Sequence, residues 1–389
     1  MPNKELLLIP GPTPVVDEIY EALASETLAH TDPRFVSIFK ESLLRTQSLF
    51  NTDGEVYVFA GSGTLAMEMA IVNTISPGEK LLVISHGYFG DRFVPLAKAY
   101  GIQVETIQAP WGQHADLEQV RQALAREKFK AVTVTHVDTS TGVMADLDAL
   151  VPLVKESGAL FLLDGVCASA AIEEDMQKAY GQPDYKIDIV LTASQKAIGV
   201  PPGLGIVAFG RQALAARAER KQVPAYFLDI ANWRPIMDNP GRYFATPPVN
   251  MVDAYHQGLE LVFKEGLQSR YQRHQALGKA VRAALHTYGM QALAEESIAA
   301  PTLSCVRYPE GVKDGDFRQA LAQKGIIVAG ALADLAGKAF RIGHMGNVTD
   351  ADFIKAIRLI GETLQELGHS VNPQAAMDTF VEVYTQSLV

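Results

Sequence analysis

The strongest constraint on the fold is an alternation of short apolar runs with longer segments that carry apolar residues at helical spacing. Segments such as GTLAMEMAIVNTI and DLDALVPLVKESG have the helical pattern. Seven apolar runs read as strands: 56–60, 81–85, 104–107, 131–137, 159–164, 187–194 and 205–210. Such alternation is typical of βαβ units, and strands without a polar side are expected where helices cover both faces. We therefore expect an α/β fold with a large domain built on a mainly parallel, seven-stranded, helix-covered sheet.

The rest of the chain predicts a second, smaller unit. At 389 residues the chain exceeds the size at which one core stops growing. Apolar runs at 302–309, 325–330 and 339–344 predict the strands of a smaller C-terminal α/β domain. We expect three parts: an N-terminal segment at 1–15, a large domain at 16–258 and a small domain at 259–389 that ends in a helix.

Three further segments carry local signals. The segment 222–250 holds five prolines and is predicted to be an irregular crossing. A long helix is predicted from near Pro248 to Lys264, and an amphipathic helix within 372–389.

Composition excludes several classes of partner. The formal net charge is −10 and the sequence has no Lys/Arg block, which argues against nucleic acid. No apolar run reaches membrane-spanning length, so we expect no membrane partner. Two cysteines are too few for a disulfide framework and favour a cytoplasmic setting. We assign no metal ligands.

Two residues at the ends of apolar strands suggest a pyridoxal-phosphate (PLP) site. Lys196 follows IDIVLTAS, where an amine would lose hydration and suit a covalent bond to an aldehyde. Asp164 ends ALFLLD, at the sheet edge where α/β proteins bind ligands. Alone, each is more often a surface lysine or a helix cap. Together they match PLP, which needs an amine at its aldehyde and an acid at its ring nitrogen.

Three other motifs are compatible with a PLP site, but each is weak evidence by itself. The turn Ser62-Gly63-Thr64 opens a helix, where backbone N–H groups favour a phosphate, although a plain strand-to-helix turn is the usual explanation. Phe89 lies between glycines in HGYFGDR and suits a flat ring, although most aromatic residues are core. Arg341 in AFRIGH suits a carboxylate, although a surface salt bridge is common for any arginine.

In order along the chain, eight motifs together resemble the class V (fold-type I) aminotransferases, especially the alanine–glyoxylate and serine–glyoxylate or serine–pyruvate group. These motifs are IPGPTPV, GSGT, GYFGDR, THVDTSTGV, LLDGVCAS, TASQKAIGVPPGLG, RYFATPPVN and RIGHMG. The resemblance covers nearly the whole chain. Phe89 and Thr64 stand where the animal enzymes have Trp and His, so their substrate preference does not transfer.

The resemblance implies a role for each matching residue. Lys196 is the Schiff-base lysine and the base that moves the α-proton, and Arg341 is the substrate-carboxylate anchor. Gly11, in the N-terminal segment, borders the substrate, and Ser140 lies near both substrate and cofactor hydroxyl. The remaining implied cofactor contacts are Asp164 at the ring nitrogen, Val166 and Phe89 on the ring faces, Ser62, Gly63, Thr64 and Gln195 at the phosphate, and Tyr243 and Thr246 at the phosphate of the partner subunit.

The function implied is transamination in two half-reactions, from a small amino acid such as alanine or serine to glyoxylate or pyruvate. The partner-facing residues imply a homodimer with two shared sites. Three alternatives remain: a cysteine desulfurase, a phosphonate or phosphoserine transaminase, and a non-catalytic partner subunit that keeps the fold.

Overall fold

The computed structural model describes residues 5–388. Its larger sheet has seven strands in the order β2-β8-β7-β6-β5-β3-β4. Strand β8 is antiparallel to both β2 and β7, and the other neighbouring strands are parallel. The bounds are β2 (Glu55–Ala60), β3 (Lys80–Ser85), β4 (Gln103–Gln108), β5 (Ala131–Thr135), β6 (Leu160–Asp164), β7 (Ile189–Ala193) and β8 (Leu204–Phe209). The predicted mainly parallel, seven-stranded sheet is confirmed.

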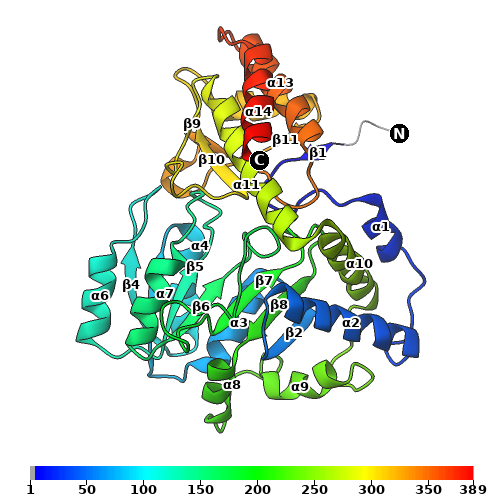
Figure 1. The fold of residues 1–389 in the computed structure, drawn as a ribbon, viewed down its shortest axis with the longest axis vertical. Coiled ribbons are helices and arrows are strands. Elements are labelled where there is room, and N and C mark those ends of the chain that lie inside the picture. Colours follow the sequence, from blue (N-terminus) through cyan, green and yellow to red (C-terminus); the bar gives the residue numbers. More distant parts are fainter. Residues whose placement is uncertain (1–4, 389) are drawn as a thin grey trace.

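Helices surround this sheet, as Figure 1 shows. Every residue of β5, β6, β7 and β8 is buried, which explains why these strands have no polar face. The helices of this part are α1 (Asp17–Leu23), α2 (Pro33–Leu49), α3 (Gly63–Thr74), α4 (Tyr88–Asp91), α5 (Phe93–Ala99), α6 (Leu117–Arg126), α7 (Leu147–Glu156), α8 (Arg211–Ala218), α9 (Ile230–Asp238) and α10 (Val249–Glu265).

The smaller unit lies at the top of Figure 1 and contains two small sheets. One has four strands in the order β12-β13-β10-β9, and the other pairs β1 with β11 in parallel. The strands are β1 (Leu6–Leu7), β9 (Gln291–Ala292), β10 (Leu303–Arg307), β11 (Ile326–Ile327), β12 (Ala329–Gly330) and β13 (Ala339–Gly343). The helices are α11 (Leu267–His286), α12 (Asp314–Gln323), the 3-10 turn η1 (Ala333–Leu335), α13 (Asp350–Glu366) and α14 (Pro373–Ser387).

Two local predictions differ from the structure. The strand predicted at 325–330 is two strands, because β11 pairs with β1 while β12 pairs with β13 in another sheet. The crossing predicted to be irregular at 222–250 contains helix α9, which begins after Asp229, whose side chain accepts from the N–H of Ala231. Pro235 lies inside this helix, three residues before its end.

Two apolar cores underlie the division into a larger and a smaller unit. The larger core runs along the chain from Ile19 to Val262, and the smaller contains Leu8 and then residues from Leu277 onward. The predicted boundary between the two domains, after residue 258, lies inside helix α10, so this exact boundary stays a proposal. The first four residues of the predicted N-terminal segment 1–15, and Val389, lie outside the described residues. Within 5–388, no helix is both long and apolar enough to cross a membrane.

Candidate active site

The carboxyl ends of the central strands bring the predicted residues to one edge of the sheet. Thr135, the last residue of β5, pairs with Asp164, the last residue of β6, and Asp164 pairs with Leu191 in β7. Lys196 follows β7 in the next turn. Parallel strands with adjacent ends form the usual ligand-binding edge of an α/β sheet.

The N-terminal segment covers the side chain of Lys196. The Nζ atom of Lys196 donates a hydrogen bond to the carbonyl of Pro10. Thr13 donates from its hydroxyl to the carbonyl of Lys196 at 2.8 Å and from its N–H to that of Gln195 at 3.1 Å. A Cβ atom at Gly11 would lie 2.5 Å from Cδ of Lys196, and Gly11 has φ +104. This approach therefore requires glycine at position 11.

Asp164 is a buried carboxylate with spare hydrogen-bonding capacity. Its Oδ1 accepts from the N–H of Val166 at 3.0 Å. Within residues 5–388 its Oδ2 has only a long contact of 3.5 Å with the Thr135 hydroxyl. Burial raises the pKa of Asp164 from 3.8 to about 7, against the effect of the Val166 hydrogen bond. Negative charge on Asp138 and Glu174 adds to the rise, and the charge of Lys196 opposes it. A cation beside Oδ2 would stabilise the ionised form.

The turn before α3 offers uncapped backbone donors. Ser62 is the N-cap residue of α3 and is extended, and its side chain makes no capping hydrogen bond. Gly63 is buried, and a Cβ there would lie 2.9 Å from Cγ2 of Val166, so Val166 packs against this turn. The free N–H groups at the start of α3 suit a phosphate. Within residues 5–388 the buried Oε1 of Gln195 has no hydrogen-bond partner, but it is an acceptor, so a contact with the phosphate would have to use the Nε2 donor of this side chain.

Phe89 is partly buried on α4, with an arginine over its ring. The guanidinium carbon of Arg92 lies 4.7 Å from the ring centroid of Phe89, and Arg92 Nη1 donates to the hydroxyl of Thr64 at 3.1 Å. Arg92 thus joins the aromatic residue to the Ser62–Thr64 turn. The position of Arg92 at the end of the motif GYFGDR is its only signal in the sequence.

Ser140 is fully buried and organised by a carboxylate that sequence analysis missed. Oδ1 of Asp138 accepts from the hydroxyl of Ser140 at 2.6 Å and from its N–H at 2.8 Å. Oδ2 of Asp138 accepts from the N–H groups of Phe89 at 3.0 Å and Gly90 at 3.1 Å. Asp138 therefore holds the Phe89 and Ser140 loops together. Its only sequence signal was its place in THVDTSTGV.

Arg341 reaches this edge from the smaller unit. It lies on β13, and its Nε donates to the carbonyl of Gly330 at 2.9 Å. Its Nη1 makes a longer contact of 3.4 Å with the carbonyl of Thr139, next to Ser140. Burial lowers the pKa of Arg341, but a guanidinium remains charged at neutral pH.

Tyr243 and Thr246 lie on the surface. Residue Tyr243 is 66% exposed, and its ring centroid lies 5.5 Å from that of His30. Thr246 is also exposed. Within residues 5–388 of this single chain, these two side chains make no hydrogen bond, ion pair or ring contact with the residues gathered around Lys196, so their predicted role depends on a partner subunit.

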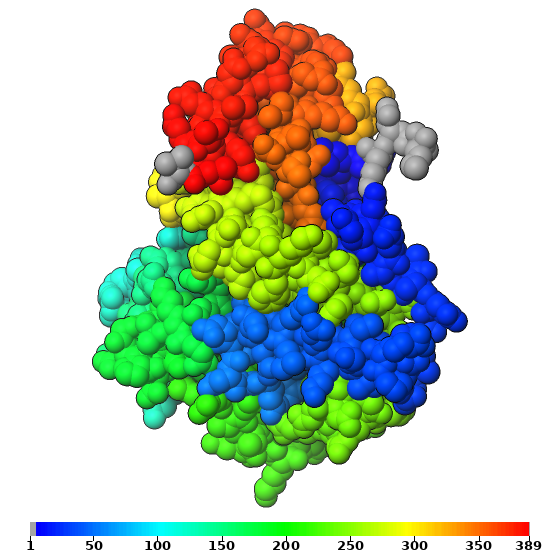
Figure 2. All heavy atoms as spheres, turned by 45° about the vertical axis from the view of Figure 1, so that its right-hand side comes forward, coloured from blue at the N-terminus to red at the C-terminus, as the bar shows by residue number. Residues whose placement is uncertain are grey.

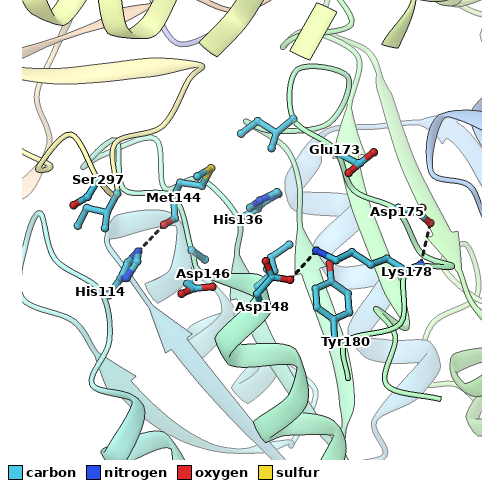
Figure 3. A pocket seen from close by; sticks show the side chains of 14 residues that line it. His114, His136, Met144, Asp146, Asp148, Glu173, Asp175, Lys178, Tyr180 and Ser297 are labelled. Atoms are coloured by element: carbon cyan, nitrogen blue, oxygen red, sulfur yellow. Dashed lines mark hydrogen bonds and ion pairs between the residues drawn. The ribbon is translucent and has the colours of Figure 1, made fainter. Parts of the chain in front are cut away.

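A cavity of about 270 Å³ lies beside this edge, between the loops that follow β5 and β6 and residues 297–298 (Figure 3). Its lining in the described range includes His136 but none of the predicted cofactor residues. Nδ1 of His136 lies 2.7 Å from Glu174 Oε1, and Glu174 Oε2 accepts from the Ser169 hydroxyl at 2.5 Å. His136 and Glu174 thus form a buried pair beside this cavity.

Comparison with known proteins identifies the family. The model of the family described as Aminotransferase class-V matches residues 13–334, which is most of the chain. The chain belongs to the class V aminotransferases.

Relatives and solved structures agree with this assignment. The soluble hydrogenase 42 kDa subunit of Anabaena cylindrica is 37% identical over 95% of this chain and 95% of its own length. Alanine–glyoxylate aminotransferase 1 of Saccharomyces cerevisiae is 34% identical over 88% of this chain and 92% of its own. The crystal structure of ureidoglycine–glyoxylate aminotransferase from Bacillus subtilis has a TM-score of 0.91 at 25% identity and covers 99% of both chains. The predicted fold-type I architecture is confirmed.

This class V aminotransferase is a PLP-dependent transaminase, and its residues fit the cofactor. Lys196 supplies an amine at the sheet edge, and Asp164 supplies a buried carboxylate oxygen able to accept from a protonated ring nitrogen. The uncapped start of α3 supplies donors for a phosphate. The described residues thus offer a partner for the aldehyde, the ring nitrogen and the phosphate of PLP.

Proposed function

We propose that this aminotransferase moves the amino group of a small amino acid, alanine or serine in type, to a small 2-oxoacid, glyoxylate or pyruvate. The observation that carries the proposal is the position of Arg341, a partly buried guanidinium whose Nη1 lies beside the Ser140 loop. Arginine binds a carboxylate through two parallel hydrogen bonds, and both substrates carry a carboxylate. The name of the yeast relative, alanine–glyoxylate aminotransferase, supports the same substrate pair.

The proposal gives Lys196 the two central tasks. Lys196 would hold the cofactor through its aldehyde, and its amine would carry the α-proton of the donor, first as general base and then as general acid. PLP supplies a conjugated ring that accepts the negative charge developing at the α-carbon. Asp164 keeps the ring nitrogen protonated, so that the ring can accept this charge.

The other predicted residues hold the cofactor and the substrate. Ser62, Gly63, Thr64 and Gln195 bind the phosphate, and Phe89 and Val166 enclose the ring. Gly11 and Ser140 border the substrate. The close approach of Pro10 and Gly11 to Lys196 leaves little room beside the amine, and this favours donors with short side chains.

The test is a spectroscopic scan of the PLP-loaded protein. Alanine and serine are expected to remove the absorbance band of lysine-bound cofactor, and glyoxylate or pyruvate is expected to restore it. Arg341→Lys keeps the charge but loses the planar fork of the guanidinium. The donor and acceptor concentrations at half-saturation should therefore both rise about tenfold or more. A band that responds only to phosphoserine or a phosphonate would contradict the proposal, as would release of sulfide from cysteine.

Two alternatives lack support from the cysteines. A desulfurase needs a reactive thiolate, but Cys167 and Cys305 are both buried. Burial raises the pKa of both thiols, that of Cys305 to about 11. The name of the Anabaena relative, a hydrogenase subunit, describes that protein. The two cysteines of the present sequence are far apart along the chain and offer no thiolate cluster for a redox metal.

We also propose that the protein is located in the cytoplasm.

We also propose a homodimer with shared sites, in which Tyr243 and Thr246 reach the cofactor phosphate of the partner subunit. The exposure of both side chains in the single chain supports this. Mixing Lys196→Ala with a Tyr243→Ala/Thr246→Val double variant should restore activity, because one site of the hybrid would have Lys196 from one subunit and Tyr243 and Thr246 from the other. Recovery should approach a quarter of the wild-type rate if subunits mix randomly. Mixtures no more active than the separate variants, or active monomers in sedimentation, would refute shared sites.

A further inference from the structure

One carboxylate and two guanidinium groups meet where α10 ends and α11 begins. Gly266, with φ +84, separates the two helices. Arg270 Nη1 donates to Glu265 Oε2 at 2.5 Å, and Arg273 Nε donates to Glu265 Oε1 at 2.6 Å. The side chain of Arg270 is only 2% exposed, and those of Arg273 and Glu265 are 20% and 26% exposed. We call these three residues the Glu265 cluster.

Arg270 binds the two loops that carry the cofactor residues of the larger unit. Its Nε donates to the carbonyl of Ala170 at 2.9 Å, in the loop that follows Asp164. Its Nη2 donates to the carbonyl of Ala197 at 2.5 Å, next to Lys196. One buried guanidinium therefore spans the Asp164 loop and the Lys196 loop.

Arg273 binds the loop that follows Arg341. It donates to the carbonyls of Gly346 and Val348, each at 3.0 Å. Gly346 itself packs on the Lys196 loop, since a Cβ there would lie 3.4 Å from the Lys196 carbonyl oxygen. In Figure 2 the yellow-green chain around the start of α11 lies between the lower body and the orange segment that contains this loop.

The charges of the cluster are stable near neutral pH. Burial lowers the pKa of Arg270 to about 10, which leaves it protonated. Burial also acts to raise the pKa of Glu265, but Arg273 and Arg270 outweigh this effect and the pKa lies below its ordinary value. Glu265 thus stays ionised and orients both arginines.

We propose that the Glu265 cluster positions the active site, with Arg270 setting the separation of the Lys196 and Asp164 loops and Arg273 holding the Arg341 loop against them. The inference rests on the proposed function of Lys196, Asp164 and Arg341. A guanidinium donates in three fixed directions, and lysine cannot reproduce this fork. A buried carbonyl that loses its donor is destabilised, so the loops would move.

The two arginines should therefore have separable effects. Arg270→Lys is expected to raise the dissociation constant of PLP about tenfold or more and to lower kcat by up to about 100-fold, the loss that a misplacement of about 1 Å can cause. Arg273→Lys is expected to raise KM for donor and acceptor about tenfold, with the PLP dissociation constant within about twofold of wild type.

Arg282→Lys is the matched control. Arg282 lies on the same helix, pairs with Glu296 at 2.7 Å and donates to the Ala300 carbonyl at 2.9 Å, with 7% of its side chain exposed. Unlike Arg270 and Arg273, Arg282 does not bind the Asp164, Lys196 or Arg341 loop. The control variant should lower the unfolding temperature much as the others do, while PLP binding and KM stay unchanged. Glu265→Gln keeps the side-chain volume and should change both readouts, which provides a second test if a lysine variant fails to fold.

The proposal is overturned if Arg270→Lys and Arg273→Lys change only the unfolding temperature, as Arg282→Lys does, or if both readouts move together in both variants. Failure of the proposed function is a different outcome. If wild type used none of the small donors, titration with PLP alone would still decide the role of Arg270, and KM for whichever donor it does use would decide that of Arg273.

Discussion

Lys196→Ala is expected to abolish transamination and to remove the absorbance band of lysine-bound cofactor. In the proposed function the amine at this position both binds the aldehyde and carries the α-proton, and it lies in the turn that follows β7 at the carboxyl edge of the sheet. Loss of a positioned base alone costs up to about 10⁴-fold in rate, so turnover should fall by at least that factor. Single-turnover kinetics with PLP-loaded protein and a visible absorbance spectrum are the measurements.

Lys196→Arg is the control that separates chemistry from charge. Arginine keeps a cation near Asp164 and a donor for the Pro10 carbonyl, but it cannot bond to the aldehyde or act as a base at neutral pH. It should therefore be as inactive as alanine. Retention of the band, or of more than about 1% of the wild-type rate, by either variant would refute the assignment of Lys196.

Asp164→Asn is expected to have opposite effects on activity and on the stability of the protein without cofactor. Asparagine cannot keep a ring nitrogen protonated, so turnover should fall by about 10²–10³-fold, as when one preorganised electrostatic group is lost. The Oδ1 atom of asparagine can still accept a hydrogen bond from the N–H of Val166, so this local contact with the backbone is kept.

The stability effect follows from the raised pKa of Asp164. The folded value is about 7 against an ordinary 3.8, so the folded chain holds this proton more tightly than the unfolded chain. This group favours folding at low pH, and that contribution is lost as pH rises from about 4 to about 7. A shift of about 3 units corresponds to about 4 kcal/mol. Without cofactor, Asp164→Asn should therefore be more stable than wild type at pH 8, by up to about 4 kcal/mol, and similar to it near pH 4.

Urea unfolding of the cofactor-free proteins at several pH values tests this expectation. Saturation with PLP should remove the difference or reverse it, because the cofactor stabilises the ionised carboxylate of wild type. A variant that is less stable than wild type at every pH would mean that the Asp164 carboxylate stabilises the empty site. That result would contradict the proposed spare acceptor at Oδ2.

Local patterns in the chain were sufficient for the larger sheet and for part of the site. Wholly apolar runs such as ALFLLD and IDIVLTAS predict buried parallel strands, because each residue between two helix layers must be apolar. The residues that follow such strands then fall at one edge, which is how Asp164 and Lys196 could be paired from the sequence. The ordered motifs added the class V resemblance, and the family match confirms it.

Longer-range contacts required the tertiary structure. The run 325–330 has one apolar pattern but contributes to two sheets, since strand partners depend on where β1 and β13 lie. Asp138 has no signal of its own, because its importance comes from donors on α4 and in the Ser140 loop.

What the sequence alone determined is therefore the type of each main element and the position of Lys196 and Asp164 at one edge of the larger sheet. The tertiary structure decided how the segment around Gly11 covers Lys196. It also decided how Arg270 and Arg273 connect the Asp164 and Lys196 loops of the larger unit with the loop that follows Arg341 in the smaller unit. The physical reason is range. Periodicity and strand ends are properties of neighbouring residues, whereas a buried arginine selects its carbonyl partners only after the cores have packed against each other.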